Sequence, residues 1–351
     1  MKRKLLFMVT ALILAAVSGC NKGGSATGGG GDGKTFKVAL VVNQKFGDNG
    51  PMDDLASGAE KAARDFAGVS IKKLESESAS KFEEDVRAMS KDYDLIVTTF
   101  PYMTDATKLV SREFPNKKYA AVFQFINVDG ARLDNIWDTE FHGEQAFYIA
   151  GYMAGLLTKT NRVGMIIGGE EPTPNAEGNG FMRGVRAANP KAAVEFSFIG
   201  SYEDPAKAKE IANAMIAKGC DFLQTDSGAS NAGVVEAAKE KNIPCSGEIT
   251  DFYDSYNGFI GRVGIGFGDT VYKAIETLAQ GSYPGGVHGI RDLTNGGYFM
   301  DWDSYQRYAG KNPAFTPVIE AGKKAEEQIK SGEVKVAFDT RVPNWSRIGQ
   351  E

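Results

Sequence analysis

Residues 194–225 read VEFSFIGSYEDPAKAKEIANAMIAKGCDFLQT, a segment that predicts one strand, one helix and a second strand. Asp204 and Pro205 mark the start of the helix, because aspartate accepts hydrogen bonds at an N-cap and proline suits the first helical position. Gly219 marks its end. Apolar side chains recur at helical spacing between these points, at Ala208, Ile211, Ala212 and Met215. The flanking runs 194–200 and 222–225 are short and contain β-branched or aromatic residues, as strands do, so the segment predicts a βαβ unit.

The same alternation extends over most of the chain. We expect a first series of strands at 36–42, 70–74, 95–100, 119–125 and 136–141, and a second at 163–168, 194–200, 222–225 and 243–247. A helix over about 145–158 separates the two series. Near the C-terminus we expect a helix over 319–329 and a last strand over 331–338. The pattern predicts an α/β protein with two lobes, each built on a doubly wound parallel sheet.

The first twenty residues have the layout of a lipoprotein signal peptide. Positions 2–4 are basic, positions 5–17 are apolar, and Val17-Ser18-Gly19-Cys20 resembles a bacterial lipobox, whose cysteine is lipidated. The apolar run is too short to span a membrane comfortably. Residues 21–35 are rich in glycine and serine and form a predicted tether. We therefore expect an extracytoplasmic domain that is held to a membrane only by a lipid on Cys20.

The composition restricts the classes of binding partner that are expected. The chain has 45 acidic and 40 basic residues, and no run of lysine or arginine follows the signal peptide, so we expect no nucleic-acid partner. Cys220 and Cys245 are expected to be free, buried thiols.

Catalytic chemistry is poorly represented. His142 and His288 are the only histidines, and neither has a partner at metal-ligand spacing. The sequence contains neither a Gly-x-Ser-x-Gly motif nor a phosphate-binding loop that ends in Gly-Lys-Ser/Thr. We therefore predict no catalytic residue, no metal and no cofactor. Paired carboxylates such as Glu170-Glu171 leave a glycosidase as a less favoured alternative.

Polar side chains gather in the loops that follow the predicted strands. Open α/β sheets bind ligands at the carboxyl ends of their strands, and polar groups there read hydroxyl or amide groups of a small molecule. The predicted ligand-binding residues are Asn43, Asp48, Asn49, Tyr102, Gln124, Asp226, Ser227, Glu248 and Asp251. The rings that could stack on a heterocycle are those of Phe46, Phe100, Tyr102, Phe123 and Phe125. Aromatic residues that alternate along a strand such as 119–125 are more often part of the core.

Three stretches resemble the basic membrane protein family, whose members are substrate-binding lipoproteins of ABC importers. They are Gly47-Asp48-Asn49-Gly50-Pro51-Met52-Asp53-Asp54, then Phe141-His142-Gly143-Glu144-Gln145-Ala146-Phe147, and the segment from Ser201 to Gly233. The resemblance implies a type I periplasmic-binding-protein fold with crossovers near residues 137, 250 and 285. The first lobe would then comprise 36–137 and about 250–284, and the second 138–249 and about 285–351.

The chain also departs from the nucleoside binders of that family. Their two stacking phenylalanines align with Pro51 and Gln224, and their lysine near the last cleft strand aligns with Gly266. Arg262 is expected to supply the missing cation from a nearby strand position. The ligand is therefore left open among a purine nucleoside, riboflavin, a sugar and an unrelated molecule.

The sequence thus predicts a monomeric, extracytoplasmic lipoprotein that captures a small polar ligand, nucleoside-like or a related hydroxylated heterocycle. Hinge closure between the lobes traps the ligand, which passes to an ABC permease. A ligand-sensing receptor without transport is the alternative.

Overall fold

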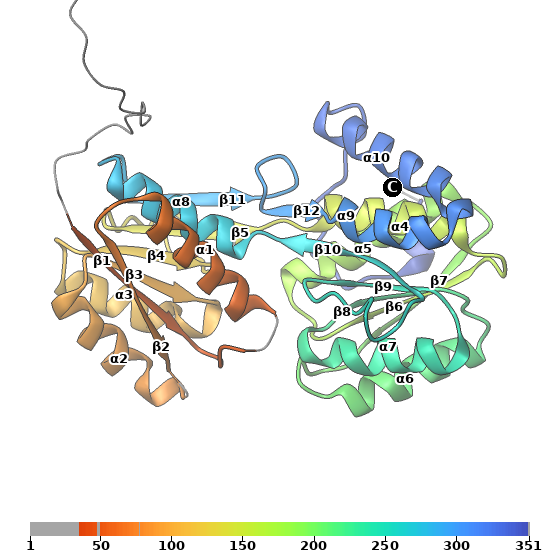
Figure 1. Cartoon of the computed structure of the whole chain (residues 1–351), viewed down its shortest axis with the longest axis horizontal. Coiled ribbons are helices and arrows are strands. Elements are labelled where there is room, and N and C mark those ends of the chain that lie inside the picture. Colours follow the sequence, from red (N-terminus) through yellow and green to blue (C-terminus); the bar gives the residue numbers. More distant parts are fainter. Residues whose placement is uncertain (1–34, 48–49, 77, 350–351) are drawn as a thin grey trace, which may run out of the picture. The chain divides into compact units, whose positions relative to one another are not determined.

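The computed structural model of the protein describes residues 35–47, 50–76 and 78–349. The predicted signal peptide, Cys20 and the tether through residue 34 lie outside the described residues, as do Asp48 and Asn49. Helices and strands alternate along the described chain (Figure 1).

The elements have the following bounds. The strands are β1 (Phe36–Val42), β2 (Val69–Glu75), β3 (Leu95–Thr99), β4 (Lys118–Val122), β5 (Ile136–Phe141), β6 (Arg162–Ile167), β7 (Ala193–Phe198), β8 (Leu223–Asp226), β9 (Cys245–Glu248), β10 (Phe259–Ile265), β11 (Val287–Arg291) and β12 (Tyr298–Met300). The α-helices are α1 (Pro51–Asp65), α2 (Ala79–Asp92), α3 (Thr104–Glu113), α4 (Glu144–Leu157), α5 (Pro172–Ala188), α6 (Pro205–Ala217), α7 (Asn231–Lys241), α8 (Phe267–Ala279), α9 (Trp302–Lys311) and α10 (Thr316–Lys330). Short 3₁₀ turns are η1 (Pro101–Met103), η2 (Gly228–Ser230), η3 (Pro313–Phe315) and η4 (Trp345–Arg347).

The first sheet is parallel and has the strand order β11-β5-β4-β3-β1-β2. Its interior strand β1, which lies between β3 and the edge strand β2, is buried on both faces from Val38 to Val42. Val38 and Leu40 pack with α1 and α8 on one face, whereas Ala39 and Val41 pack with α2 and α3 on the other. Two-sided burial explains why this strand is a continuous apolar run.

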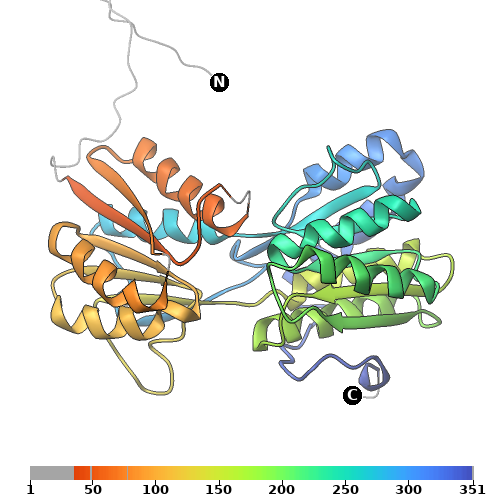
Figure 2. The ribbon, with the colours of Figure 1, turned by 90° about the horizontal axis from the view of Figure 1, so that it is seen from below.

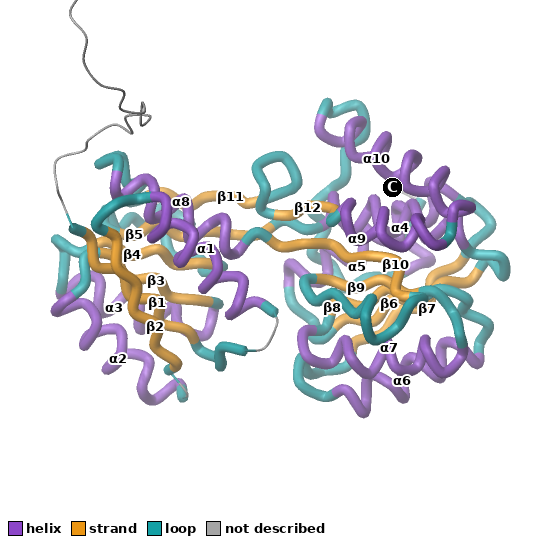
Figure 3. The backbone as a smooth tube through the Cα atoms, viewed as in Figure 1, coloured by secondary structure: helices purple, strands orange, loops and turns teal. Residues whose placement is uncertain are grey.

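The second sheet has the order β12-β10-β9-β8-β6-β7, in which only β12 is antiparallel to its neighbour. Met165 and Ile167 face the cluster formed with α4 and α5, and Ile166 faces α6 and α7. Figure 2 shows helices on both faces of each sheet, and Figure 3 shows the strands in orange between the purple helices.

The segment with which the sequence analysis began folds as predicted. Asp204 caps α6, and its Oδ1 accepts a hydrogen bond from the backbone N–H of Lys207 at 2.9 Å. Pro205 is the first helical residue. Gly219 follows the helix with a φ of +96°, a conformation that glycine adopts without steric cost.

The chain passes between the two sheets after β5, after β10 and after β11, that is near residue 142, at residue 266 and over 292–297. These passages lie later than the predicted crossovers at 137, 250 and 285. The second passage differs most from its predicted position, at residue 266 and not 250. The reason is that β10 belongs to the second sheet, where it pairs with β9 and Val263 lies opposite Glu248. The first lobe therefore contains residues 35–141 and 267–291, and the second contains 144–265 and 298–349, with gaps at the undescribed positions.

The strand predicted over 331–338 is absent, and an irregular segment takes its place. The chain that continues from it is held by side chains of α5 and not by a sheet edge. Asn175 Nδ2 donates to the carbonyl oxygen of Thr340 at 2.9 Å, and Asn179 Nδ2 donates to that of Asp339 at 2.8 Å. Amide side chains satisfy the backbone here, so strand pairing is not required.

Close packing of α4 on α5 leads to a first prediction. A Cβ at Gly151 would lie 2.0 Å from the carbonyl oxygen of Phe181, so Gly151→Ala forces the two helices apart. We expect it to lower the free energy of unfolding by about 1–3 kcal/mol, measured by urea denaturation. Gly310→Ala in α9 is the matched control, because a Cβ there meets nothing within 4 Å. The control is expected to stabilise the protein by up to about 1 kcal/mol, and equal effects of the two variants would contradict the packing argument.

Candidate ligand-binding site

Three carboxylates meet at the carboxyl ends of the second sheet. Asp226 is the last residue of β8, Glu248 is the last residue of β9, and Glu177 lies in α5. Their exposed fractions are 7%, 4% and 3% respectively. We call this group the acidic cluster. It occupies the position at which parallel α/β sheets bind ligands.

The contacts of the acidic cluster leave two oxygens without a hydrogen bond. The Asp226 carboxyl lies within hydrogen-bonding reach of those of Glu177 and Glu248. Glu248 Oε1 accepts from the backbone N–H of Gly228 at 3.3 Å, and the Tyr298 hydroxyl donates to Glu177 Oε1 at 2.5 Å. Asp226 Oδ2 and Glu248 Oε2 receive no donated hydrogen bond from the described residues. A buried acceptor without a hydrogen bond destabilises the site, so a ligand that donates a hydrogen bond to either oxygen is bound more tightly.

Burial makes the acidic cluster difficult to ionise. It raises the pKa of Glu177 to about 7 and that of Glu248 to about 8, and repulsion from neighbouring carboxylates adds to both shifts. The pKa of Asp226 is raised well above its usual range, first by burial and then by Glu177. Burial also raises the pKa of Glu144, at the start of α4, to about 7. Near neutral pH the acidic cluster therefore holds protons.

The acidic cluster has no cationic counterpart in the part of the chain that the structure describes. None of its three members forms an ion pair with lysine or arginine, and no basic side chain is among the strongest influences on their pKa values. The described residues also hold no group of three or more His, Cys, Asp or Glu side chains that is arranged to bind a metal ion.

Strained backbone marks the same end of both sheets. Phe100 follows β3 with a φ of 61°, Phe123 follows β4 with a φ of 56°, and Ile249 follows β9 with a φ of 50°. Positive φ values are uncommon for residues other than glycine and concentrate at functional sites. Phe100 and Phe123 pack edge to face at 5.9 Å between ring centroids, and both are half-buried against the first-lobe core.

In the first lobe, the predicted residues that are described occupy strand ends. Asn43 Oδ1 accepts from the Thr99 hydroxyl at 3.1 Å. Tyr102 is 68% exposed, in η1 after β3. Gln124 is fully buried after β4, where its Nε2 donates to the Thr98 hydroxyl at 2.9 Å and its Oε1 has no partner among the described residues.

In the second lobe, the structure brings Asp226 and Glu248 together but engages three other predicted residues elsewhere. The Ser227 hydroxyl donates to Asn231 Oδ1 at 2.9 Å, at the start of α7. Asp251 accepts from the backbone N–H of Tyr253 at 2.9 Å and forms an ion pair with Arg307, so it stabilises a turn. Arg262 Nε donates to Asp301 Oδ2 at 2.7 Å, so its charge already has a partner.

Glu177 and Tyr298 are site residues that the sequence analysis missed. The helix around Glu177 reads PTPNAEGNG, a composition typical of a loop, so no helix is predicted between the strands at 163–168 and 194–200. Glycine is needed in α5 because a Cβ at Gly180 would lie 2.2 Å from the carbonyl oxygen of Glu144. No local signal reveals this requirement, which comes from the contact between two helices.

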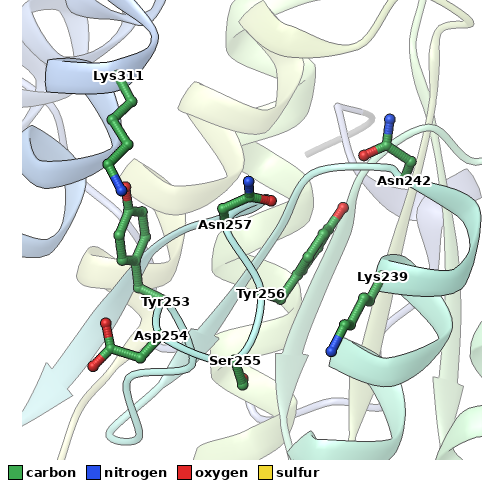
Figure 4. A pocket seen from close by; sticks show the side chains of 8 residues that line it. All are labelled: Lys239, Asn242, Tyr253, Asp254, Ser255, Tyr256, Asn257 and Lys311. Carbon is green, nitrogen blue, oxygen red and sulfur yellow. The ribbon is translucent and has the colours of Figure 1, made fainter.

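A separate surface pocket lies at the other end of α7 (Figure 4). Lys239 and Asn242 line it together with residues 253–257 and Lys311. An 11-residue helix is about 16 Å long, which separates this pocket from Asn231 and the acidic cluster. The pocket belongs to the amino ends of the strands, where ligands of open α/β sheets are not bound.

None of the described helices combines the length and the apolar character that a membrane-spanning helix needs.

Two solved structures with a similar architecture are described as solute-binding proteins. An ABC transporter system solute-binding protein from Aeropyrum pernix K1 superposes with a TM-score of 0.75 at 19% identity, covering 90% of this chain and 97% of that one. One from Conexibacter woesei gives a TM-score of 0.70 at 21% identity, covering 87% and 100%. The two lobes therefore have the type I periplasmic-binding-protein fold.

Residues 35–336 match the family model Bmp, described as ABC transporter substrate-binding protein PnrA-like, and the chain belongs to this family. It is thus an extracytoplasmic substrate-binding protein of an ABC transporter. Among its relatives, the CD4+ T-cell-stimulating antigen of Listeria innocua is 26% identical over 96% of this chain and 99% of its own length. The ABC transporter nucleoside-binding protein BmpA of Lactococcus lactis is 27% identical over 95% and 99%. The basic membrane protein A of Borreliella burgdorferi is 24% identical over 67% of each chain.

Proposed function

We infer that this protein, as a monomer, traps a small polar ligand between its two lobes and hands it to an ABC permease. The acidic cluster carries this inference, because it leaves two buried acceptors unsatisfied at the strand ends of the second sheet. Closure has to be driven by contacts that exist only when both lobes touch the ligand. The three passages between the sheets are the natural hinge for such a movement.

The proposed ligand is nucleoside-like or a related hydroxylated heterocycle. The name of the Lactococcus lactis relative supports a nucleoside. Carboxylate oxygens accept two hydrogen bonds each and suit hydroxyl donors. Gln224, which aligns with a stacking ring, is fully buried and donates to the carbonyl oxygen of Thr225 at 3.1 Å. That residue therefore supports no stacking contact, and the ligand is expected to differ from the common purine nucleosides.

The test of this function is detection of a ligand and of closure on the full-length protein extracted in detergent. Native mass spectrometry is expected to show one small molecule bound per chain. Removing it by unfolding and refolding is expected to increase hydrogen–deuterium exchange at residues 142, 266 and 292–297. A protein that carries no ligand, is stabilised by no small metabolite and shows no change at these residues contradicts the proposed function.

The proposed lipid anchor on Cys20 has its own test. Cys20→Ala is expected to release a folded protein into the soluble fraction, because every described element begins after residue 35. Membrane fractionation with a salt wash measures the change, and Cys220→Ala is the control, since that buried thiol is not at a processing site. Retention of the Cys20→Ala variant on washed membranes contradicts the anchor.

A further inference from the structure

The acidic cluster excludes an anionic ligand group from its own end of the second lobe. Backbone N–H groups before α7 would attract an anion, as helix starts do. Here the chain uses them itself: Gly228 N–H donates to Glu248 Oε1 at 3.3 Å, and Ser227 N–H donates to Asn231 Oδ1 at 2.9 Å. A ligand that approaches this end meets carboxyl oxygens and no free backbone donor from these two residues.

Further ionisable side chains surround the acidic cluster beyond its three members. Glu144 of α4 and Glu171 before α5 act on it electrostatically. Burial and the carboxylates of the cluster in turn raise the pKa of the phenols of Tyr202, from the loop before α6, and Tyr298 of β12. Asn231 of α7 is the neutral polar group on this side. Five carboxyl groups thus lie together without a lysine or arginine partner to the acidic cluster among the described residues. Buried carboxylates are ordinarily paired with a cation.

We propose that the ligand presents a positively charged nitrogen, an ammonium or a cationic heterocycle, to Asp226 and Glu248. This proposal rests on the proposed function and specifies the chemistry of its ligand. The N–H groups or the charge of the ligand satisfy Asp226 Oδ2 and Glu248 Oε2, the two acceptors that the protein leaves without donors. Charge-assisted hydrogen bonds of this kind are about twice as strong as neutral ones.

Binding of a cation requires the acidic cluster to give up protons to the solvent. Burial raises the pKa of Glu177 to about 7 and that of Glu248 to about 8, so the ligand-free site holds protons that the cation displaces. Affinity for a cation therefore rises as the pH increases from 6 to about 8.5. A neutral hydroxylated ligand displaces no proton and shows no such rise.

A matched pair of probes tests the proposal on the full-length, refolded protein. Adenosine is neutral, and 5′-amino-5′-deoxyadenosine differs from it by an ammonium group. Calorimetry at pH 8 is expected to show at least tenfold tighter binding of the amine, with proton release that depends on the ionisation enthalpy of the buffer. Asp226→Asn and Glu248→Gln are expected to remove at least tenfold of that advantage. Glu170→Gln is the control, since that exposed carboxylate lies outside the acidic cluster.

If neither nucleoside binds, the charge of the molecule that co-purifies with the protein tests the proposal. A cationic molecule supports it. A neutral or anionic molecule overturns it and leaves the transport function intact. If nothing co-purifies, thermal stabilisation is measured with a library of cationic metabolites and their neutral analogues. Stabilisation by neutral members alone overturns the charge assignment, and stabilisation by none overturns the proposed function as well.

Discussion

Asp339→Ala is expected to lower the free energy of unfolding by about 3 kcal/mol at pH 7, near the lower limit for buried ion pairs because its partners retain some contact with water. Asp339 is 8% exposed and accepts from Arg341 Nε at 2.7 Å and from Arg183 at 2.9 Å. Removing the carboxylate breaks the two ion pairs through which Asp339 holds the C-terminal segment on α5.

The pH dependence of this loss follows from the sign of the pKa shift. Hydrogen bonds from Arg341 and Arg183 hold the pKa of Asp339 well below its usual range. Its stabilising contribution is therefore complete above the unfolded pKa, about 3.9, and is lost as the pH falls toward the lower folded value. Urea denaturation at pH 7, 4 and 2.5 measures the difference between variant and wild type.

Glu83→Gln is the control for Asp339→Ala, because Glu83 also bonds an arginine, Arg87, but on an exposed helix surface. We expect no measurable change from it. A difference between Asp339→Ala and wild type that stays constant from pH 7 to pH 2.5 would show that the lost packing, and not the lost charge, destabilises the variant.

Glu248→Gln is expected to stabilise the ligand-free protein at pH 8.5, by an amount on the order of a few kcal/mol. Burial and the neighbouring Asp226 raise the pKa of Glu248 to about 8, so the folded protein binds a proton there that the unfolded chain releases near pH 4.5. Wild-type stability from this group is therefore complete in acid and declines as the pH rises from about 4.5 to 8. The amide has the same shape and does not ionise, so it avoids the decline.

Thermal denaturation of refolded protein measures this effect as a Tm difference between Glu248→Gln and wild type. The difference is expected to be small at pH 4.5 and to increase up to pH 8.5, whereas Glu170→Gln is expected to give a flat profile. A lower Tm for Glu248→Gln at pH 8.5 would show that the charged carboxylate stabilises the fold.

Apolar runs in the sequence predict most strands of the two sheets, because interior strands of parallel sheets are buried on both faces. β1 is the clearest case. β10 is not among the strands that the apolar runs predict, because FIGRVGI contains two glycines, which make room for neighbouring rings. A Cβ at Gly261 would lie 2.5 Å from the Tyr305 ring, and one at Gly264 would lie 2.2 Å from that of Phe299. Such requirements come from residues far along the chain and have no local pattern.

The residues of the candidate site also divide into those that could be predicted from the sequence and those that could not. Asp226 and Glu248 could be predicted because each lies at the end of a strand, directly after the predicted strands 222–225 and 243–247, and strand ends converge on one edge of a sheet. Glu177 could not be predicted, since its place depends on how α5 packs on α4. The ion pairs of Asp251 with Arg307 and of Arg262 with Asp301 could not be predicted either. Both partners lie on the segment that follows the third passage, far along the chain from Asp251 and Arg262.

Gly143 lies on the first passage, directly before α4, and a Cβ there would lie 2.4 Å from Glu177 Oε1 and 2.7 Å from the Tyr298 ring. One residue thus forms both part of the connection between the lobes and a wall of the charged site. The connection on which movement of the lobes would depend and the site that would select the ligand therefore have Gly143 in common. A side chain at this position would displace Glu177 or Tyr298, so a change in the connection between the lobes would also change the candidate site.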